Sequence, residues 1–402
     1  MVIRVGVNLV QLDAAVTDAM GRPITDLRLE DFNLEVDGRK QAITNSAYFG
    51  DLAQAGPAPA HRDPAGSEES STVAKSSGDE DQDGVVVFVI DDLNLSAEGM
   101  HRARRALQGF ARAGGVGRTM VAVRTTSDES PSFTLFRSSE GFARAVDALR
   151  FTLQGSQGRA GQMTTSDPGI ASRGWSAAKF LQAPVINPSQ DLANTEQGAF
   201  SLLTTINGLG SIPGRKAIVF VSEGFSLTQT PTLLGAGSPL GSLFGDSSND
   251  AALRMITDVA NRAFVVIYAA DPRSMVVDFP GARENITADE ARLVTRFQAP
   301  ATQGEGSLRQ LAAGTGGLVL TNRSNQLGSG LFDVMRDQRS YYLIGFEPPV
   351  ETFARTLGKP AFHRIRLTVN RKETRVRTRA GFYGVTDQEI TEHTPPRTPG
   401  GR

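Results

Sequence analysis

Residues 85–90 read Val-Val-Val-Phe-Val-Ile, an unbroken apolar run of six residues. A strand with one face in water alternates apolar and polar side chains, whereas a continuous apolar run is typical of a parallel strand that is buried on both faces. From residue 85 to residue 338 such runs alternate with helix patterns, for example a helix pattern at 96–113 and an apolar run at 217–221. This alternation predicts an α/β fold with a doubly wound, mostly parallel, Rossmann-like sheet.

Both ends of the chain have a different, β-rich pattern. Residues 1–48 alternate apolar and polar side chains and contain the hairpin dipeptide Asp37-Gly38. Residues 362–369 and 374–379 alternate in the same way. Because neither end is large enough to bury a core alone, we predict one small β-sandwich that is formed from both chain ends, with the α/β domain inserted between them.

The composition changes along the chain predict the domain boundaries. Stretches rich in Ala, Pro, Gly, Ser and acidic residues are typical of mobile segments. The predicted parts are the first half of the β-sandwich at 1–49, a flexible linker at 50–84, the α/β domain at 85–338 with insertions near 151–189 and 225–248, the second half of the sandwich at 339–385, and a disordered tail at 386–402.

Charge and composition exclude several classes of function. The chain has 42 Lys and Arg residues against 43 Asp and Glu residues and no long basic run, so a nucleic-acid partner is not predicted. It has no Cys, which excludes disulfides, thiol catalysis and cysteine-based metal sites. The four His residues, at 61, 101, 363 and 393, lie far apart in the sequence, which argues against a His-built catalytic triad.

No segment of the sequence predicts a membrane helix or a signal peptide. No apolar stretch approaches the roughly twenty residues that a membrane helix needs. The first ten residues, Met1–Val10, have the pattern of a strand rather than of an export signal.

Oxygen-bearing side chains follow two of the predicted parallel strands. Asp92, Asn94 and Ser96 occupy alternate positions after the first strand, and Glu223 follows the strand at 217–221. The carboxyl ends of parallel strands meet at one edge of a sheet, where ligands gather. Carboxylate, amide and hydroxyl oxygens are hard ligands that suit Mg²⁺, Mn²⁺ or Ca²⁺. Thr195, near the start of the predicted helix that precedes the strand at 217–221, is a candidate for a further hydroxyl ligand.

At these residues the chain resembles the von Willebrand factor type A (VWFA) domains. Asp92-x-Asn94-x-Ser96 is similar to their Asp-x-Ser-x-Ser motif, the metal-ion-dependent adhesion site, and Ser222-Glu223-Gly224 stands where they usually have Asp-Gly. The chain from about 5 to 385 resembles the VWFA-related domain proteins of Acidobacteria. The residues that carry this resemblance are Val16-Thr-Asp-x-x-Gly-Arg-Pro23, Leu29-Glu-Asp-Phe32, Asp91-Asp-Leu-Asn-Leu-Ser96, Pro213-Gly-Arg-Lys216, Val221-Ser-Glu-Gly-Phe225, Tyr268-Ala-Ala-Asp-Pro272, Leu311-Ala-x-x-Thr-Gly-Gly317, Ser340-Tyr-Tyr342, Gly345-Phe346 and Arg379-x-Gly-Phe-Tyr383.

The resemblance implies a non-enzymatic binding module. In such domains the motif side chains, a loop Thr and the strand-end acid hold a divalent cation, and one coordination position stays open for a carboxylate of a protein or cell-surface ligand. The resemblance also implies a location outside the cytoplasm, periplasmic or secreted. For this chain it implies a metal site of Asp92, Asn94, Ser96, Thr195 and Glu223, with Mg²⁺ or else Mn²⁺ or Ca²⁺ as the cofactor.

The sequence departs from the motif and leaves alternatives open. Asn94 replaces a Ser and Glu223 replaces an Asp. Asp91 is the alternative to Asp92, although Leu93 and Leu95 would then occupy the other ligand positions. The competitors of Thr195 are the hydroxyls at 125, 126, 164 and 165. The residues after the first strand are also compatible with nothing more than a helix cap at Ser96.

Two other functions compete with the cation-dependent module. The first is a structural or assembly protein whose metal site is degenerate and which binds its partners without metal. The second is a hydrolase that uses the same cation with Asp91 as a base, which the lack of a nucleophile–base pair and of a nearby His disfavours. The sequence does not identify the partner or the oligomeric state.

Overall fold

The computed structural model describes residues 9–50, 84–149, 188–224, 249–273, 304–321 and 327–383, apart from 118, 129, 131, 211, 213, 354, 357 and 358. The chain divides into two compact units. Unit 1 combines Met1–Gly78 with Arg339–Arg402, and unit 2 is Asp79–Gln338. The predicted linker, the two predicted insertions and the predicted tail lie almost wholly outside the described residues and stay predictions.

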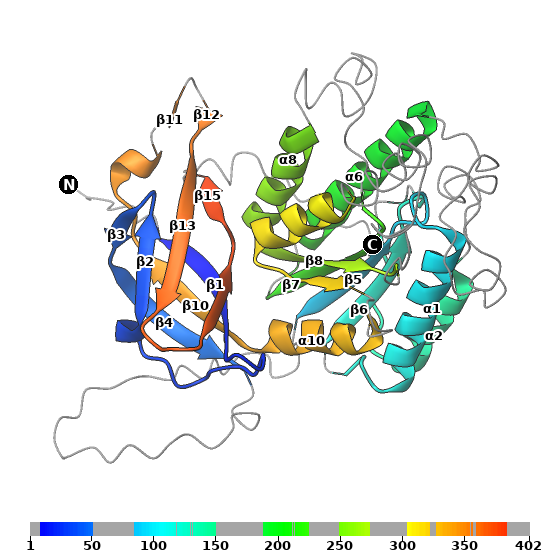
Figure 1. Cartoon of the computed structure of the whole chain (residues 1–402), viewed down its shortest axis with the longest axis horizontal. Coiled ribbons are helices and arrows are strands. Elements are labelled where there is room, and N and C mark those ends of the chain that lie inside the picture. The colour runs from blue at the N-terminus through cyan, green and yellow to red at the C-terminus, as the bar shows by residue number, and fades with distance from the viewer. Residues whose placement is uncertain are drawn as a thin grey trace, which may run out of the picture. The chain divides into compact units, whose positions relative to one another are not determined.

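Unit 2 is built around a five-stranded parallel sheet with the order β6-β5-β7-β8-β9 (Figure 1). Because β6 lies on one side of β5 and β7 on the other, the winding of the chain reverses at β5. Such a reversal opens a crevice at the carboxyl ends of the strands. The strands are β5 (Val85–Ile90), β6 (Met120–Thr125), β7 (Lys216–Val221), β8 (Val265–Asp271) and β9 (Val319–Thr321).

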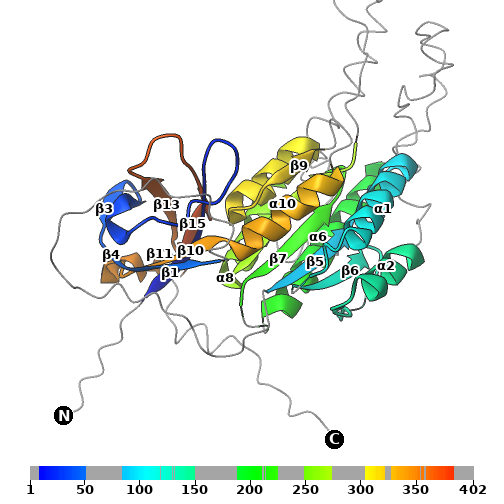
Figure 2. The ribbon, with the colours of Figure 1, turned by 90° about the horizontal axis from the view of Figure 1, so that it is seen from below.

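Helices cover both faces of this sheet, which explains the unbroken apolar strands. Val86, Phe88 and Ile90 of β5 pack with one layer of helices, α1, α2 and α10, which Figure 2 shows over one face. The alternate residues Val85 and Val87 pack with α6, α8 and a helical segment at 304–315. The named helices are α1 (Ala97–Arg112), α2 (Ser139–Ala148), α6 (Pro188–Gly210), α8 (Asn249–Arg262) and α10 (Leu327–Arg339).

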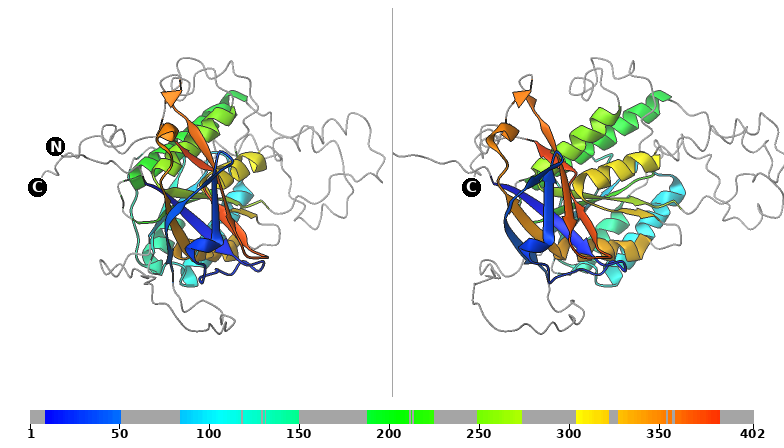
Figure 3. Two further views of the ribbon diagram at one scale, coloured as in Figure 1. Left: turned by 90° about the vertical axis from the view of Figure 1, so that its left-hand side faces the viewer. Right: turned by 60° about the vertical axis from the view of Figure 1, so that its left-hand side comes forward.

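Unit 1 consists of two four-stranded antiparallel sheets whose strands come from both chain ends (Figure 3). One sheet has the order β14-β1-β10-β4 and the other the order β15-β13-β2-β3. A shared core that includes Leu12, Leu34 and Ile344 joins them. The strands are β1 (Val10–Thr17), β2 (Phe32–Val36), β3 (Arg39–Gln41), β4 (Ile43–Phe49), β10 (Tyr341–Phe346), β13 (Phe362–Val369), β14 (Arg375–Thr378) and β15 (Gly381–Tyr383); a small pair, β11 (Arg355–Thr356) and β12 (Lys359–Pro360), and the 3-10 turns η1 (Leu29–Asp31) and η3 (Val350–Phe353) complete the unit.

The sheets agree with the fold class that the sequence predicts: an α/β unit with a parallel sheet, and antiparallel sheets built from both chain ends. In the described ranges, no helix is both long and apolar enough to cross a membrane.

The start of α1 is the local feature that positions the candidate site. Ser96 has extended backbone angles, φ −67° and ψ 160°, and its hydroxyl accepts a hydrogen bond from the backbone N–H of Gly99 at 3.0 Å. Glu98 lies in the first turn and Arg112 in the last turn. The helix dipole favours a negative charge at the first position and a positive charge at the second. The Ser96 cap therefore fixes the end of the loop that joins β5 to α1.

Candidate binding site at the carboxyl edge of the parallel sheet

Four neighbouring strands deliver polar residues to one edge of the sheet. Asp91 and Asp92 follow β5, Thr126 follows β6, Glu223 comes two residues after β7, and Asp271 is the last residue of β8. Asp91, Asp92, Thr126 and Glu223 are all 0% exposed. Buried carboxylates persist only where hydrogen bonds or opposite charges compensate them, so their partners define what this edge can do.

Asp91 is the residue on which three strand ends converge. Its Oδ1 atom lies 3.0 Å from the hydroxyl of Thr126, and its Oδ2 atom accepts a hydrogen bond of 2.6 Å from the hydroxyl of Ser222. The side-chain amide of Asn94 donates to both carboxylate oxygens, at 3.0 and 3.1 Å. These three neutral groups satisfy the hydrogen-bonding capacity of the buried Asp91 side chain.

Asp92 is turned toward the end of β6 instead. Its Oδ1 atom accepts from the backbone N–H of Ser127 at 3.0 Å and lies 3.1 Å from the hydroxyl of Thr126. Its other oxygen accepts from the hydroxyl of Ser127. The two adjacent aspartates therefore share Thr126 but otherwise have separate partners.

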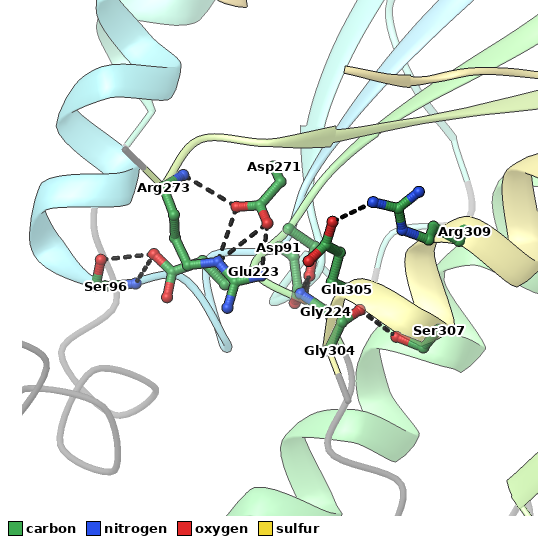
Figure 4. Close-up of polar contacts among 11 residues, drawn as sticks. Asp91, Ser96, Glu223, Gly224, Asp271, Arg273, Gly304, Glu305, Ser307 and Arg309 are labelled. Atoms are coloured by element: carbon green, nitrogen blue, oxygen red, sulfur yellow. Dashed lines mark hydrogen bonds and ion pairs between the residues drawn. The ribbon is translucent and has the colours of Figure 1, made fainter. Parts of the chain in front are cut away.

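Glu223 reaches across from β7 to the start of α1 (Figure 4). Its Oε1 atom accepts hydrogen bonds from the backbone N–H of Ser96 at 3.1 Å and from the Ser96 hydroxyl at 2.6 Å. Gly99 leaves room for this carboxylate, since a Cβ atom there would lie 2.3 Å from Glu223 Oε1. An acid at a helix N-terminus is favoured by the helix dipole.

A positive charge also lies at this edge (Figure 4). Arg273 binds the carboxylate of Asp271 through its Nε atom at 2.9 and 3.0 Å, and its backbone N–H donates to Asp271 at 3.0 Å. Burial by itself lowers the pKa of Arg273, but the hydrogen bonds and charge of Asp271 and the charges of two glutamates raise it above its ordinary value. These glutamates are Glu223 and Glu305.

The five predicted metal ligands fall into separate groups. Asp92 faces Thr126 and Ser127, Asn94 faces Asp91, and Ser96 pairs with Glu223. Thr195 is buried in α6 directly after Asn194, whose backbone oxygen lies 3.5 Å from the amide nitrogen of Asn94. Within the described ranges, no group of three or more His, Cys, Asp or Glu side chains is placed to hold a metal ion.

The oxygen chemistry of the edge suits a hard cation, but the arrangement of the five residues does not fit one. Asn94 turns a nitrogen, not an oxygen, toward Asp91 in this hydrogen-bond network. Ser96 and Glu223 use each other as partners, and a guanidinium lies near Glu223. Among the alternatives left open by the sequence, the structure brings Asp91 and Thr126 together.

Sequence reasoning gave no site role to Ser127, Ser222, Asp271 or Arg273, although Ser222 and Asp271 lie within motifs that carry the resemblance. The strand-end rule that found Glu223 applies equally to Asp271, because β8 is also an unbroken apolar strand. Nothing in the local pattern distinguishes Arg273 from the other arginines of the chain. Thr164 and Thr165, two of the competitors for the hydroxyl ligand, lie outside the described residues.

No known protein family and no curated protein matches the chain. Among solved structures, the chain is similar to the pilus adhesin SpaC from Lactobacillus rhamnosus GG in its open conformation, with 10% sequence identity and a TM-score of 0.29. This similarity covers 75% of the chain and 42% of the adhesin, so the chain spans less than half of the adhesin's length. A likeness this weak carries no argument about function.

Proposed function

We propose that unit 2 is a non-enzymatic, VWFA-like binding module that holds a protein partner without a divalent cation. The support from the sequence is the set of VWFA-like motifs. The observation that carries the cation-independent form is that the strand-end acids already have partners within the chain. Asp91 accepts from Asn94 and Ser222, Glu223 accepts from Ser96, and Asp271 binds Arg273.

The arrangement gives little support to a hydrolase. A base needs an accessible lone pair within hydrogen-bond reach of a substrate. Asp91, the candidate base, is 0% exposed and accepts hydrogen bonds from three side chains. Of the two His residues that the structure describes, His101 lies on α1 and His363 lies in unit 1. We therefore assign the buried acids a structural role and the binding of the partner to exposed surface of the module.

The cation-dependent adhesion site that the sequence predicts is the second candidate. One observation favours it: the hydroxyls of Thr126 and Ser222 flank Asp91 and come from the strands on either side of β5. In that mode Asp91 and Thr126, the alternatives to the predicted ligands Asp92 and Thr195, would bind Mg²⁺ or Mn²⁺ together with Ser222, and the partner would offer a carboxylate.

Partner binding with and without a chelator distinguishes the two candidates. The full chain is immobilised, partners are recovered from extracts of the source organism, and the affinity of a purified partner is measured in Mg²⁺ and in EDTA. An unfolded sample of the same chain is the control for non-specific retention. We expect a saturable partner with the same Kd in both buffers. A Kd that weakens tenfold or more in EDTA would establish the cation-dependent mode, and the lack of any saturable partner would contradict the binding function.

On the same resemblance we propose a location outside the cytoplasm. Cell fractionation with an antibody against the chain tests this directly. Recovery of the chain with cytoplasmic markers would contradict it.

A further inference from the structure

Arg273 brings a fixed positive charge to the carboxyl edge of the sheet. It lies two residues after Asp271, the end of β8, and its guanidinium binds the Asp271 carboxylate through Nε and Nη2. The Arg273 side chain is only 13% exposed. Guanidinium groups stay protonated at all ordinary pH values and match carboxylates geometrically, so this charge is permanent.

The charges of acids from three different segments act on Arg273, which forms hydrogen bonds with one of them, Asp271. β7 and β8 run parallel, with Val221 opposite Ala270, so Glu223 and Asp271 extend from neighbouring strand ends. The third acid, Glu305, belongs to the helical segment at 304–315 and also pairs with Arg309. All three acids raise the pKa of Arg273, whereas burial lowers it.

Close backbone packing holds two of these segments together. Gly224 has a φ of +88°, and a Cβ atom there would lie 2.1 Å from the backbone oxygen of Gly304. The residue after Glu223 and the residue before Glu305 are therefore in backbone contact. The hydroxyl of Ser307 donates to the same Gly304 oxygen at 2.8 Å. This contact holds the backbone next to Glu223 against the backbone next to Glu305, and Figure 4 shows both acids in the neighbourhood of the Arg273–Asp271 pair.

We propose that Arg273 is the resident cation of this edge and takes the electrostatic place of a divalent metal ion. Its guanidinium pairs with Asp271 and its charge acts on Glu223 and Glu305 as well. A second cation entering beside it would meet a like charge in a poorly hydrated environment. This inference rests on the proposed function, because it explains how the binding module could work without a metal ion. Its test needs no partner, so the two can fail separately.

The test compares thermal stability and Mn²⁺ binding in the full-length wild type and in Arg273→Ala. For the wild type we expect that added Mn²⁺ does not change the Tm and that electron paramagnetic resonance detects no protein-bound Mn²⁺. In Arg273→Ala we expect a Tm lower by roughly 5 °C or more, because three acids lose their common counter-charge. We also expect saturable Mn²⁺ binding in this variant that restores part of the lost Tm.

Two control variants separate this role from a general effect of removing an arginine. Arg309→Ala removes a 60% exposed partner of Glu305 and should give neither a large Tm loss nor a response to Mn²⁺. Arg273→Lys keeps the charge and should respond to Mn²⁺ less than Arg273→Ala. If Arg273→Ala does not fold, Arg273→Gln is used in its place, and its Mn²⁺ response is compared with that of Arg309→Ala.

The outcomes are distinct. Equal Mn²⁺ responses of the Arg273 and Arg309 variants would overturn the role of Arg273 and leave the proposed function standing. Saturable Mn²⁺ binding by the wild type would overturn both the inference and the cation-independent function. Binding of Mn²⁺ only after Arg273 is removed would support the inference.

Discussion

Ser96 and Glu223 lie 127 positions apart in the sequence and are joined by two hydrogen bonds to one carboxylate oxygen, of 2.6 and 3.1 Å. The same Ser96 hydroxyl accepts a hydrogen bond from the backbone N–H of Gly99 and so caps the N-terminus of α1. One side chain thus both caps a helix and ties the end of β7 to the loop after β5. The residue that the motif marks as a metal ligand is here a junction between two segments of the chain.

Ser96→Ala should destabilise unit 2 more than the loss of a helix cap alone. The matched control is Ser138→Ala, because Ser138 caps α2 through the N–H of Gly141 at 3.1 Å but is exposed and has no acid attached. We expect a cost of about 1 kcal/mol for Ser138→Ala and of about 2–3 kcal/mol for Ser96→Ala. Urea denaturation followed by circular dichroism measures both, and equal costs would contradict the role of the Ser96–Glu223 pair.

Two glycines of α1 should respond oppositely to alanine. A Cβ atom at Gly99 would lie 2.3 Å from Glu223 Oε1. A Cβ atom at Gly109 would point into open space, with no neighbouring atom within 4 Å. Gly99→Ala should therefore destabilise unit 2 by about 1–3 kcal/mol. Gly109→Ala should stabilise it by up to about 1 kcal/mol through helix propensity. A neutral Gly99→Ala would show that the Glu223 carboxylate is free to move away.

Asp91→Asn should be strongly destabilising although it keeps the shape of the side chain. The new amide would turn a donor toward the Ser222 or Thr126 hydroxyl, both of which are placed to donate to Asp91. We expect a loss of about 2–4 kcal/mol in the free energy of unfolding. Asp128→Asn is the control, because Asp128 is exposed, and should change the stability by less than about 0.5 kcal/mol. Similar effects of the two variants would contradict the central position of Asp91.

Acid should weaken unit 1 partly through Asp37. Burial tends to raise the pKa of Asp37, but hydrogen bonds from His363 at 2.7 Å and from the N–H of Arg364 at 2.8 Å hold it below its ordinary value. A lowered pKa in the folded chain gives stability that is present above the unfolded pKa of 3.8 and is lost as the pH falls through the folded pKa.

Asp37→Asn should remove this contribution without straining the turn, because Asn tolerates the positive φ of 50° at this position. The wild type should be more stable than the variant near neutral pH, and the difference should shrink below about pH 4. Asp18, whose pKa is also lowered, is common to both proteins, so the difference isolates Asp37. Urea midpoints measured across this range check the prediction, and a difference that grows in acid would contradict it.

The sequence alone determined the two kinds of sheet and the edge at which polar residues gather. An unbroken apolar run such as Val85–Ile90 is buried only if other elements pack on both faces of the strand. The alternating side chains at 362–369 need packing on one face only. Strand direction then fixes which ends of the strands meet, and the parallel pairing of β5 with β7 places Asp92 and Glu223 at one edge.

Tertiary structure decided which atoms meet at that edge. Spacing along the chain could not show that Asn94 turns to Asp91, that Thr126 lies between two aspartates, or that Arg273 stands beside Glu223. These contacts join residues that follow the ends of separate strands. There the direction of a side chain depends on the backbone conformation of the loop and no longer on the alternation of side chains along a strand. The physical reason is that local patterns encode burial and direction, whereas the pairing of buried charges is settled only when distant segments pack together.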